Sequence, residues 1–402
     1  MIVRARTLVT MDGPPIPNGA VAITGDTITE VGRWPEMRAR ATGEVIDLGE
    51  RILLPGLINA HCHLDYTGLR GAIPAEASFT GWIKAINARK AELSPDDYVR
   101  SIEAGAEEAA SFGTTTLANF TAFPELVGRV VEPALRIWWF AEMIDLRGPV
   151  DVRETLGKLE REVGARGRAG LAPHAPFTAS AELYAATAKL AVERNVPAST
   201  HLAESVEEMT MFRDGRGPLF DFLRSLNRSV EDCGARTPLA LLLGMGVFDE
   251  RWIVAHLNEL LADDFALLER GPRFHVAHCP RSHAYFRHSP FALRRLRGLG
   301  FNLCLGTDSL ASNGDLSLFA EVRQLWKTEQ SLRADEILEM VTINPAAALA
   351  QAGRLGRIRA DFQADVIAIA GSVSGRAEEI IEFAENVPFA MIAGEILKSR
   401  KT

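Results

Sequence analysis

The chain has 402 residues, of which 47% are hydrophobic and 24% are charged, so it can bury a large core and is not expected to be disordered. The net charge of -8, without any dense run of Lys and Arg, argues against nucleic-acid binding. The opening residues lack an apolar stretch of signal-peptide length, and no later window approaches the roughly 18 apolar residues of a membrane span. These features predict a globular cytoplasmic protein with no nucleic-acid or membrane partner.

The first fifty residues alternate β-rich runs with turns rich in Gly, Pro, Asp and Asn, which predicts a small antiparallel sheet. From residue 51 onward, short apolar runs alternate with helical stretches, as in repeated βα units. Helices are expected over residues 95–112, 181–194 and 334–350. The eight apolar runs cover residues 53–64, 114–120, 136–144, 169–177, 197–205, 252–257, 273–280 and 302–309. Eight such units indicate an α/β fold, a (β/α)8 TIM barrel.

Short β runs return in the last part of the chain, after the final predicted helix. Each terminal piece alone has too little apolar surface to fold. We therefore expect residues 1–54 and 357–402 to form one composite β-sandwich domain and residues 55–356 to form the barrel. The four cysteines are scattered and form no C-x-x-C pair, which is typical of reduced core thiols.

Polar residues gather at the predicted carboxyl ends of the barrel strands, the face on which barrel enzymes carry their active sites. A single histidine there is as readily explained by a hydrogen-bonded structural role. The clustering of most of the nine histidines favours a chemical role for the set. Its members are His61, His63, His174, His201, Glu204, His256, His278 and Asp308.

The tripeptide His61-Cys62-His63 ends the first barrel strand. The strand period of two sends both imidazoles to one side, where they can bind one metal ion, and sends Cys62 to the opposite layer. With His201 and Asp308, each ending another apolar strand, the set offers three nitrogens and one oxygen and leaves a position open for water, as catalytic zinc requires. The motifs of serine hydrolases, P-loop NTPases and dinucleotide-binding folds are absent from the sequence.

Seven segments together resemble the amidohydrolase superfamily, in its branch of deaminases and chlorohydrolases that act on aminopurines, cytosine, adenosine derivatives and triazines. They are PGLINAHCHLDYTGLRG, FGTTTLANF, APHAPFT, THLAES, VAHLNEL, VAHCPRS and LGTDSLASN. The resemblance implies that His61, His63, His201 and Asp308 bind the metal. It further implies that Glu204 shuttles protons and that His256 lies beside the metal-bound water. Glu204 has an alternative interpretation as a surface carboxylate that opens a helix.

The metal count follows from a comparison with binuclear relatives, which bridge their ions with a carboxylated lysine at the end of the fourth strand. The fourth run, AGLAPHAPF, contains no lysine, and all seven lysines lie outside the predicted strand ends. We therefore expect one divalent ion, with zinc favoured and ferrous iron also compatible with the donor set.

Four residues are candidate substrate contacts. His174 resembles the substrate-contacting histidine of nucleoside-type deaminases, and Trp82 is a candidate aromatic wall, although it also suits a barrel-helix core. Arg281 and His283 lie in the segment after strand seven, where His283 replaces the Asn common in the family.

Three further features concern the same face. Thr80 and Gly81 occupy positions where relatives that grip a ribose often carry carboxylates, which puts ribose recognition of the usual kind in doubt. Glu142, Asp145 and Arg147 follow strand three, where they either contact substrate or form a solvated loop. His278 is expected to have a structural or supporting role.

The resulting hypothesis is a metal-dependent hydrolytic deaminase that releases ammonia from an amino-substituted nitrogen heterocycle. The substrate would be an aminopurine or an adenosine-type nucleoside derivative, including aminofutalosine-like and thioether nucleosides. One alternative is release of chloride or alkylamine from a triazine-like ring by the same water activation. Another is a noncatalytic scaffold, which the complete ligand set disfavours. The superfamily resemblance is also compatible with a homo-oligomer.

Overall fold

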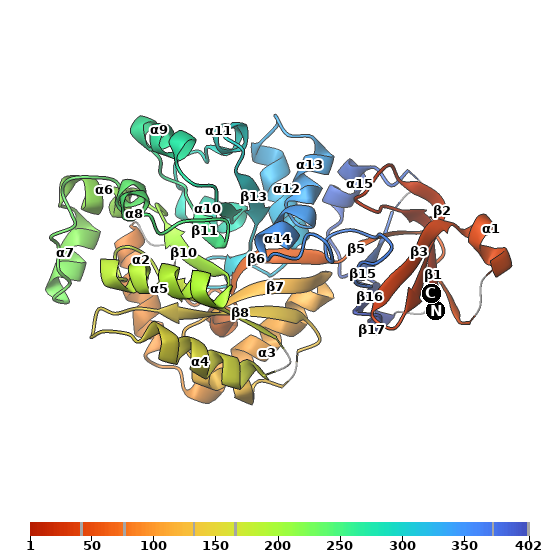
Figure 1. Cartoon of the computed structure of the whole chain (residues 1–402), viewed down its shortest axis with the longest axis horizontal. Helices are drawn as coiled ribbons and strands as arrows, with labels where there is room; N and C mark the ends of the chain where they lie inside the picture. The colour runs from red at the N-terminus through yellow and green to blue at the C-terminus, as the bar shows by residue number, and fades with distance from the viewer. Residues whose placement is uncertain (41–42, 75–77, 132, 165–166, 372–373, 400–402) are drawn as a thin grey trace.

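The chain forms two sheets, a ring of parallel strands surrounded by helices and a separate mixed sheet built from both ends of the sequence (Figure 1). The computed structural model describes all residues except 41–42, 75–77, 132, 165–166, 372–373 and 400–402. Figure 1 shows the ring with its helices on the left and centre, and the terminal sheet, with both chain ends, on the right.

The barrel strands all pair in parallel in the order in which they occur along the chain. Their composition explains their burial, since runs rich in Val, Ile, Ala and aromatic residues suit strands covered on both faces. The strands are β6 (Leu57–His63), β7 (Thr114–Thr121), β8 (Arg136–Met143), β9 (Arg168–Pro173), β10 (Ala198–Leu202), β11 (Trp252–His256), β12 (His275–His278), β13 (Asn302–Leu305) and β14 (Asp308–Ser309).

The eighth strand closes the ring in two pieces. β13 pairs with β12, and after two residues β14 pairs with β6, with Asp308 opposite Cys62. Gly306 lies between the pieces, where a Cβ atom would stand 2.6 Å from the carbonyl oxygen of His61. Glycine therefore allows the close approach that brings Asp308 beside the histidines of β6.

Helices surround the barrel (Figure 1). The predicted helices at 95–112 and 181–194 are present with nearly the expected bounds. The helices are α2 (Phe79–Lys90), α3 (Pro95–Ser111), α4 (Val152–Val163), α5 (Ala181–Arg194), α6 (Val206–Asp214), α7 (Pro218–Ser225), α8 (Pro238–Met245), α9 (Ala262–Arg270), α10 (Pro280–Phe286), α11 (Leu293–Gly298), α12 (Leu318–Thr328), α13 (Ala334–Glu339) and α14 (Ile343–Ala348), with the 3-10 turns η2 (Leu64–Leu69) and η3 (Pro124–Arg129).

The expectation of one helix over 334–350 was wrong, because the segment forms two short helices, α13 and α14. Pro345 supplies the physical reason. Proline lacks an amide donor, and its ring clashes with the carbonyl group four residues earlier, so a continuous helix would be broken near residue 341. Among the described residues, no helix combines the length and the apolarity that a bilayer crossing requires.

The barrel interior is filled by alternate strand residues such as Phe120, Phe140 and Ile253. The register of β6 against β7 shifts between Asn59 and Cys62. Beyond this shift, Cys62 packs in the layer that contains α3, whereas the ring of His61 contacts that of Phe120 in the interior, with the centroids 4.5 Å apart. A β-bulge thus turns the strand so that the histidines face inward.

The terminal sheet joins strands from both ends of the chain in the order β17-β16-β15-β5-β1-β2-β3, with β4 beside β1. Its inner residues, such as Val21, Leu53 and Phe389, share one apolar cluster. The expected pairing of the two ends is therefore present, as one continuous mixed sheet. The strands are β1 (Ile2–Leu8), β2 (Ile16–Thr24), β3 (Thr27–Arg33), β4 (Val45–Asp47), β5 (Arg51–Pro55), β15 (Val366–Ala370), β16 (Phe389–Ile392) and β17 (Glu395–Ser399); α1 (Trp34–Met37), η1 (Arg38–Arg40) and α15 (Ala377–Glu382) accompany them.

One ion pair ties the sheet to the barrel. Arg136 on β8 donates to both carboxylate oxygens of Asp365, just before β15, and to Oε1 of Gln363 at 2.8 Å. Two guanidinium nitrogens thus engage a carboxylate that is almost fully buried.

Candidate active site

The carboxyl ends of four barrel strands bring titratable side chains together. β6 supplies His61 and His63, β10 supplies His201, β11 supplies His256 and β14 supplies Asp308. Glu204 follows β10 directly. All six side chains are buried, with relative exposures of 7% or less.

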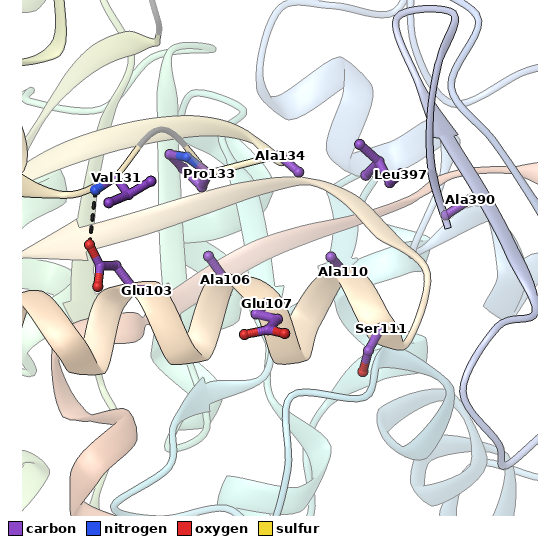
Figure 2. Close-up of a pocket in the computed structure, with 10 residues that line it drawn as sticks. All are labelled: Glu103, Ala106, Glu107, Ala110, Ser111, Val131, Pro133, Ala134, Ala390 and Leu397. Carbon is purple, nitrogen blue, oxygen red and sulfur yellow. Dashed lines mark hydrogen bonds between the residues drawn. The ribbon is translucent and has the colours of Figure 1, made fainter. Parts of the chain in front are cut away.

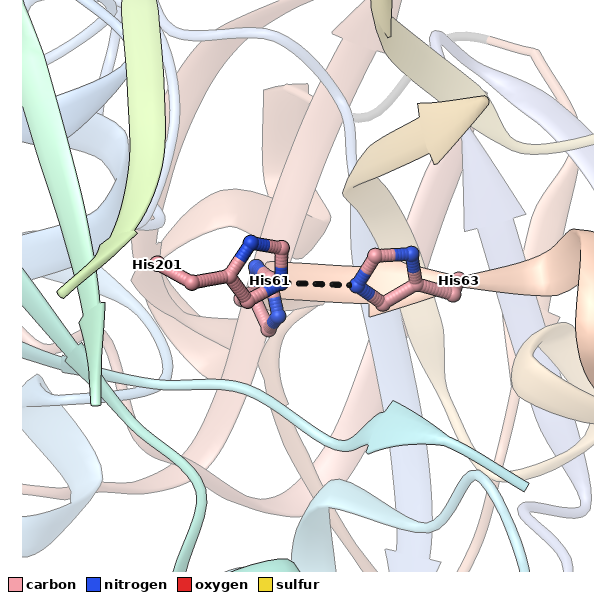
Figure 3. A group of neighbouring side chains, drawn as sticks. All are labelled: His61, His63 and His201. Carbon is pink, nitrogen blue, oxygen red and sulfur yellow. Dashed lines mark hydrogen bonds between the residues drawn. The ribbon is translucent and has the colours of Figure 1, made fainter. Parts of the chain in front are cut away.

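Three histidines form the centre of the site (Figure 3). Nε2 of His63 lies 3.1 Å from Nε2 of His201, and the two rings are nearly parallel. The ring of His61 stands almost perpendicular to both, with its centroid 4.9 Å from each. One nitrogen from each ring lies within 4.8 Å of the others, so all three can contact a single ion.

Asp308 completes the set from the closing strand. Its Oδ1 lies 3.7 Å from Nε2 of His61 and 3.9 Å from Nε2 of His63. Its Oδ2 accepts hydrogen bonds from the hydroxyls of Ser282, at 2.6 Å, and Ser312, at 3.3 Å. The two serines therefore fix the carboxylate with one oxygen turned toward the histidines.

The donor set fits a divalent metal. Both ring nitrogens of His61 are buried and lack a hydrogen-bond partner among the described residues, which is costly in a protein interior. Burial and the neighbouring His61 lower the pKa of His201 to about 3, so its imidazole is neutral at physiological pH. Neutral imidazoles and one carboxylate are the ligands that catalytic zinc accepts.

A second group, formed by Glu142, His174 and His201, also meets the distance condition for a metal. It shares His201 with the first group. Nδ1 of His201 lies 2.8 Å from the carbonyl oxygen of His174, to which it donates, and only its Nε2 remains free to bind an ion. The two groups therefore compete for the same nitrogen of His201.

Glu204 lies next to the candidate ligands in an environment that favours its neutral form. Its Oε1 is 3.8 Å from Nε2 of His256, and both residues fall within one group with Asp308. Burial, together with the nearby carboxylates of Asp308 and Glu208, raises the pKa of Glu204 well above its usual range. A neutral carboxyl group at this position can donate a proton at physiological pH.

Two residues that the sequence did not single out hold Glu204 in place. Glu208 accepts hydrogen bonds from the backbone amides of Ala203, at 3.1 Å, and Glu204, at 2.7 Å. Asn258 donates from Nδ2 to the carbonyl oxygen of Glu204 at 3.1 Å. The only sequence signal for Glu208 is its place four residues after Glu204.

The backbone is left-handed at three positions of the site. Ala203, His256 and Asp308 have φ values of 50°, 72° and 57°. Non-glycine residues adopt such values rarely, and they do so mostly where the surrounding structure imposes them at functional sites. The sharp turns at these strand ends direct Glu204, His256 and Asp308 toward one another.

Two predicted substrate contacts, His174 and Trp82, have different surroundings. The ring of His174 is 4.8 Å from that of His201, and its Nδ1 is 2.6 Å from the hydroxyl of Thr178. Trp82, on α2, packs against Phe79 and Phe286. Its Nε1 is buried and has no hydrogen-bond partner in the described parts of the chain.

The other two predicted substrate contacts, Arg281 and His283, have partners within the protein. Nη1 of Arg281 pairs with Oδ1 of Asp315 at 2.5 Å. Nδ1 of His283 lies 3.1 Å from Oδ1 of Asn258, the residue that holds Glu204. His278, expected to be structural, stacks on Phe291 with the centroids 3.9 Å apart.

Thr80, at a position where ribose-binding relatives often carry a carboxylate, contacts a carboxylate from another helix. Its hydroxyl donates to Oε2 of Glu207 on α6, and the backbone amides of Phe79 and Thr80 donate to the same carboxylate at 3.0 Å. Glu207 thus joins α6 to the start of α2.

A hollow of about 500 Å³ lies elsewhere, between α3 and the terminal sheet (Figure 2). Its walls include Ala106, Ala110, Pro133 and Leu397, and Oε1 of Glu103 accepts a hydrogen bond from the amide of Val131 at its rim. None of the histidines described above lines it.

Comparison with known proteins identifies the family of the chain. The model of the amidohydrolase family matches residues 52–397. The chain belongs to the amidohydrolase family. Among curated members, a 5-methylthioadenosine/S-adenosylhomocysteine deaminase of Pyrococcus furiosus is 30% identical over 92% of this chain and 86% of its own length. A 5'-deoxyadenosine deaminase of Methanococcoides burtonii is 29% identical over 92% and 83%.

Solved amidohydrolases share the fold. A zinc-bound adenosine deaminase from Xanthomonas campestris superposes with a TM-score of 0.84 at 23% identity, over 99% of this chain and 92% of the other. Helicobacter pylori aminofutalosine deaminase gives 0.87 at 20% identity over 98% and 99%. An atrazine chlorohydrolase from Arthrobacter aurescens gives 0.82 at 19% identity over 99% and 95%. The predicted fold and the assignment to the hydrolases of the deaminase and chlorohydrolase branch of the amidohydrolases are confirmed.

Proposed function

We propose that this amidohydrolase is a hydrolytic deaminase that releases ammonia from the 6-amino group of an adenosine-type nucleoside derivative. The observation that carries the proposal is the joint placement of four candidate ligands, His61, His63, His201 and Asp308, beside the buried carboxyl of Glu204. The names of the curated relatives, which are deaminases of adenosine derivatives, support the substrate class.

His61, His63, His201 and Asp308 would hold one divalent ion, and we propose zinc, with ferrous iron as the second choice. The zinc-bound relative supports this assignment. When bound, the ion makes hydroxide available at neutral pH because it lowers the pKa of its water ligand to about 7.

Glu204 is proposed as the general acid and proton shuttle. The amino-bearing carbon of a purine is a poor electrophile until the adjacent ring nitrogen is protonated. The carboxyl of Glu204 gives its proton to that nitrogen while water attacks the carbon. The resulting carboxylate then takes the proton of the newly added hydroxyl and passes it to the amino group, and the proton left on Asp308 returns to Glu204 at the end of the cycle. The carbon–nitrogen bond breaks, and ammonia leaves as the ring carbonyl forms.

Asp308 and His256 are proposed to handle the proton of the attacking water. The carboxylate of Asp308 accepts that proton, and Nε2 of His256, 3.8 Å from Oε1 of Glu204, orients the water by a hydrogen bond. Burial lowers the pKa of His256 well below its usual range, so the ring is neutral and can accept as well as donate.

For the substrate, we propose that His174, Trp82, Arg281 and His283 surround the nucleoside. His174 has the strongest support because its ring lies beside that of His201. Trp82 offers an aromatic face and an unpartnered Nε1. Arg281 would have to leave Asp315 to reach a substrate, and His283 would act next to Asn258. The cytoplasmic location and the homo-oligomeric state stay predictions from the sequence.

The test is a product assay with zinc-loaded protein. The panel comprises adenosine, 5'-deoxyadenosine, 5'-methylthioadenosine, S-adenosylhomocysteine, free adenine and a chlorinated triazine. We expect stoichiometric ammonia and the corresponding inosine-type product from at least one nucleoside, with no chloride from the triazine. Chloride release without any ammonia would instead establish a dechlorinase.

A further inference from the structure

We infer that Glu142 is a positioning residue of the metal centre: it accepts the Nδ1 proton of His63 and thereby holds that ring for metal binding through Nε2. The inference rests on the metal ligands proposed above and adds a residue outside that set. It concerns one pair of side chains, on the barrel strands β6 and β8, which lie on either side of β7.

Two unpartnered atoms face each other at this point. Oε1 of Glu142 lies 3.9 Å from Nδ1 of His63, and the two side chains are only 5% and 7% exposed. Both atoms are buried, and neither has a hydrogen-bond partner in the part of the chain that the structure describes. A carboxylate oxygen and an imidazole nitrogen are complementary, so each can satisfy the other.

Metal binding determines which nitrogen carries the proton. Nε2 of His63 faces His201 and Asp308, so it is the nitrogen available to the ion. A neutral imidazole bound through Nε2 must carry its hydrogen on Nδ1, and metal-binding histidines usually give that hydrogen to a carboxylate or carbonyl. The gap exceeds a hydrogen bond by about 1 Å, which rotation about the broad terminal torsion of glutamate can close.

Charge supports the acceptor role. The positive charge of Lys90 acts on the carboxyl of Glu142 and favours its ionised form. Lys90 extends from α2 with its ammonium 4.5 Å from the ring centre of Tyr66, which itself stacks on His63. The cation thus favours a charged acceptor behind the metal ligand.

Zinc affinity separates this role from a contact with substrate. We would measure the zinc dissociation constant by chelator competition for the wild type, Glu142→Ala and Glu142→Gln. We expect alanine to weaken zinc binding about 10- to 100-fold, the usual effect of removing such a partner. Glutamine keeps an oxygen acceptor and should weaken binding less. The thermal midpoints of the metal-free proteins report whether each variant folds, and Glu142→Gln remains informative if alanine is unstable.

The control is Asp145→Asn, which removes a charge just beyond the same strand end. Its carboxylate accepts hydrogen bonds from the amide and hydroxyl of Ser180, so it is already occupied and zinc affinity should not change. Unchanged zinc affinity in Glu142→Ala overturns the inference, and a raised KM in that same variant would assign Glu142 to the substrate. A wild type that binds no zinc would overturn the proposed function itself.

Discussion

The side chain of Asn258 holds the backbone of Glu204, because its Nδ2 donates to the carbonyl oxygen of Glu204 at 3.1 Å. The other end of the same amide, Oδ1, faces Nδ1 of His283 at 3.1 Å. A residue beyond strand seven is therefore connected, through one side chain, to the residue that would donate the proton. The sequence did not predict this connection between His283 and Glu204.

Asn258→Ala should lower kcat about five- to tenfold, because one lost hydrogen bond of about 1 kcal/mol frees the backbone that orients Glu204. KM and zinc content should stay near the wild-type values. Steady-state kinetics with elemental analysis measure all three. A KM that rises while kcat is unchanged would show that Asn258 serves substrate binding.

Glu204→Gln should lower kcat by about 10²- to 10⁴-fold, since glutamine retains the size of the side chain but cannot donate and recover a proton. Zinc should remain bound, because Glu204 is not among the proposed ligands. Ammonia release and metal content are the measurements. Activity within threefold of the wild type would remove Glu204 from the mechanism.

Asp308→Asn should abolish turnover while the fold remains stable. The hydroxyls of Ser282 and Ser312 can still donate to the amide oxygen, so the local hydrogen bonds are largely kept. The loss of the negative charge should also weaken zinc binding. Thermal unfolding, zinc affinity and kcat test the three parts, and a fully active variant would contradict the role of Asp308.

Removal of the metal by a chelator should abolish activity and lower the unfolding temperature, because the buried imidazole nitrogens then lose the ion that satisfies them. Zinc at about 100 times its dissociation constant should restore about 2.7 kcal/mol of stability. One equivalent of zinc should suffice. Calorimetry with and without zinc provides the test, and binding of two equivalents at similar affinity would contradict a single site.

Stability should fall as the pH rises toward 8, partly through Glu321 on α12. Burial raises the pKa of this carboxyl from 4.5 to about 8, so between these values the folded state keeps a proton that the unfolded chain has released. Each pH unit in this window then costs up to about 1.4 kcal/mol. Glu321→Gln should flatten the dependence between about pH 5 and about pH 8 in urea titrations. An equally steep dependence in the variant would exclude Glu321 as its source.

The sequence predicted the barrel and the strand ends that carry the proposed metal ligands because both depend on local patterns. Apolar runs that end in His63, His201 and Asp308 locate the strand ends, and the barrel brings strand ends to one face. The bulge in β6 and the division of strand eight depend instead on contacts such as that of Gly306 with His61. Such contacts join residues far apart in the chain and leave no periodic signal.

The supporting residues were harder to predict for a different reason. Glu208 resembles any carboxylate in the first turn of a helix, and Ser282 and Ser312 belong to a residue type common in loops. Their roles become visible only when their oxygen atoms are seen beside Glu204 and Asp308. Glu208 follows Glu207 in the first turn of α6, and nothing in this pattern indicates that Glu208 faces the protein interior.

The pairing of β5 with β15 has a consequence for synthesis on the ribosome. β5 leads directly into the first barrel strand, yet the strand that covers one of its edges is translated about three hundred residues later. Until then the nascent polypeptide exposes an open strand edge, to which other chains can add. Chaperone demand and aggregation during expression should therefore depend on the stretch from β15 to β17 more than on the catalytic half of the molecule.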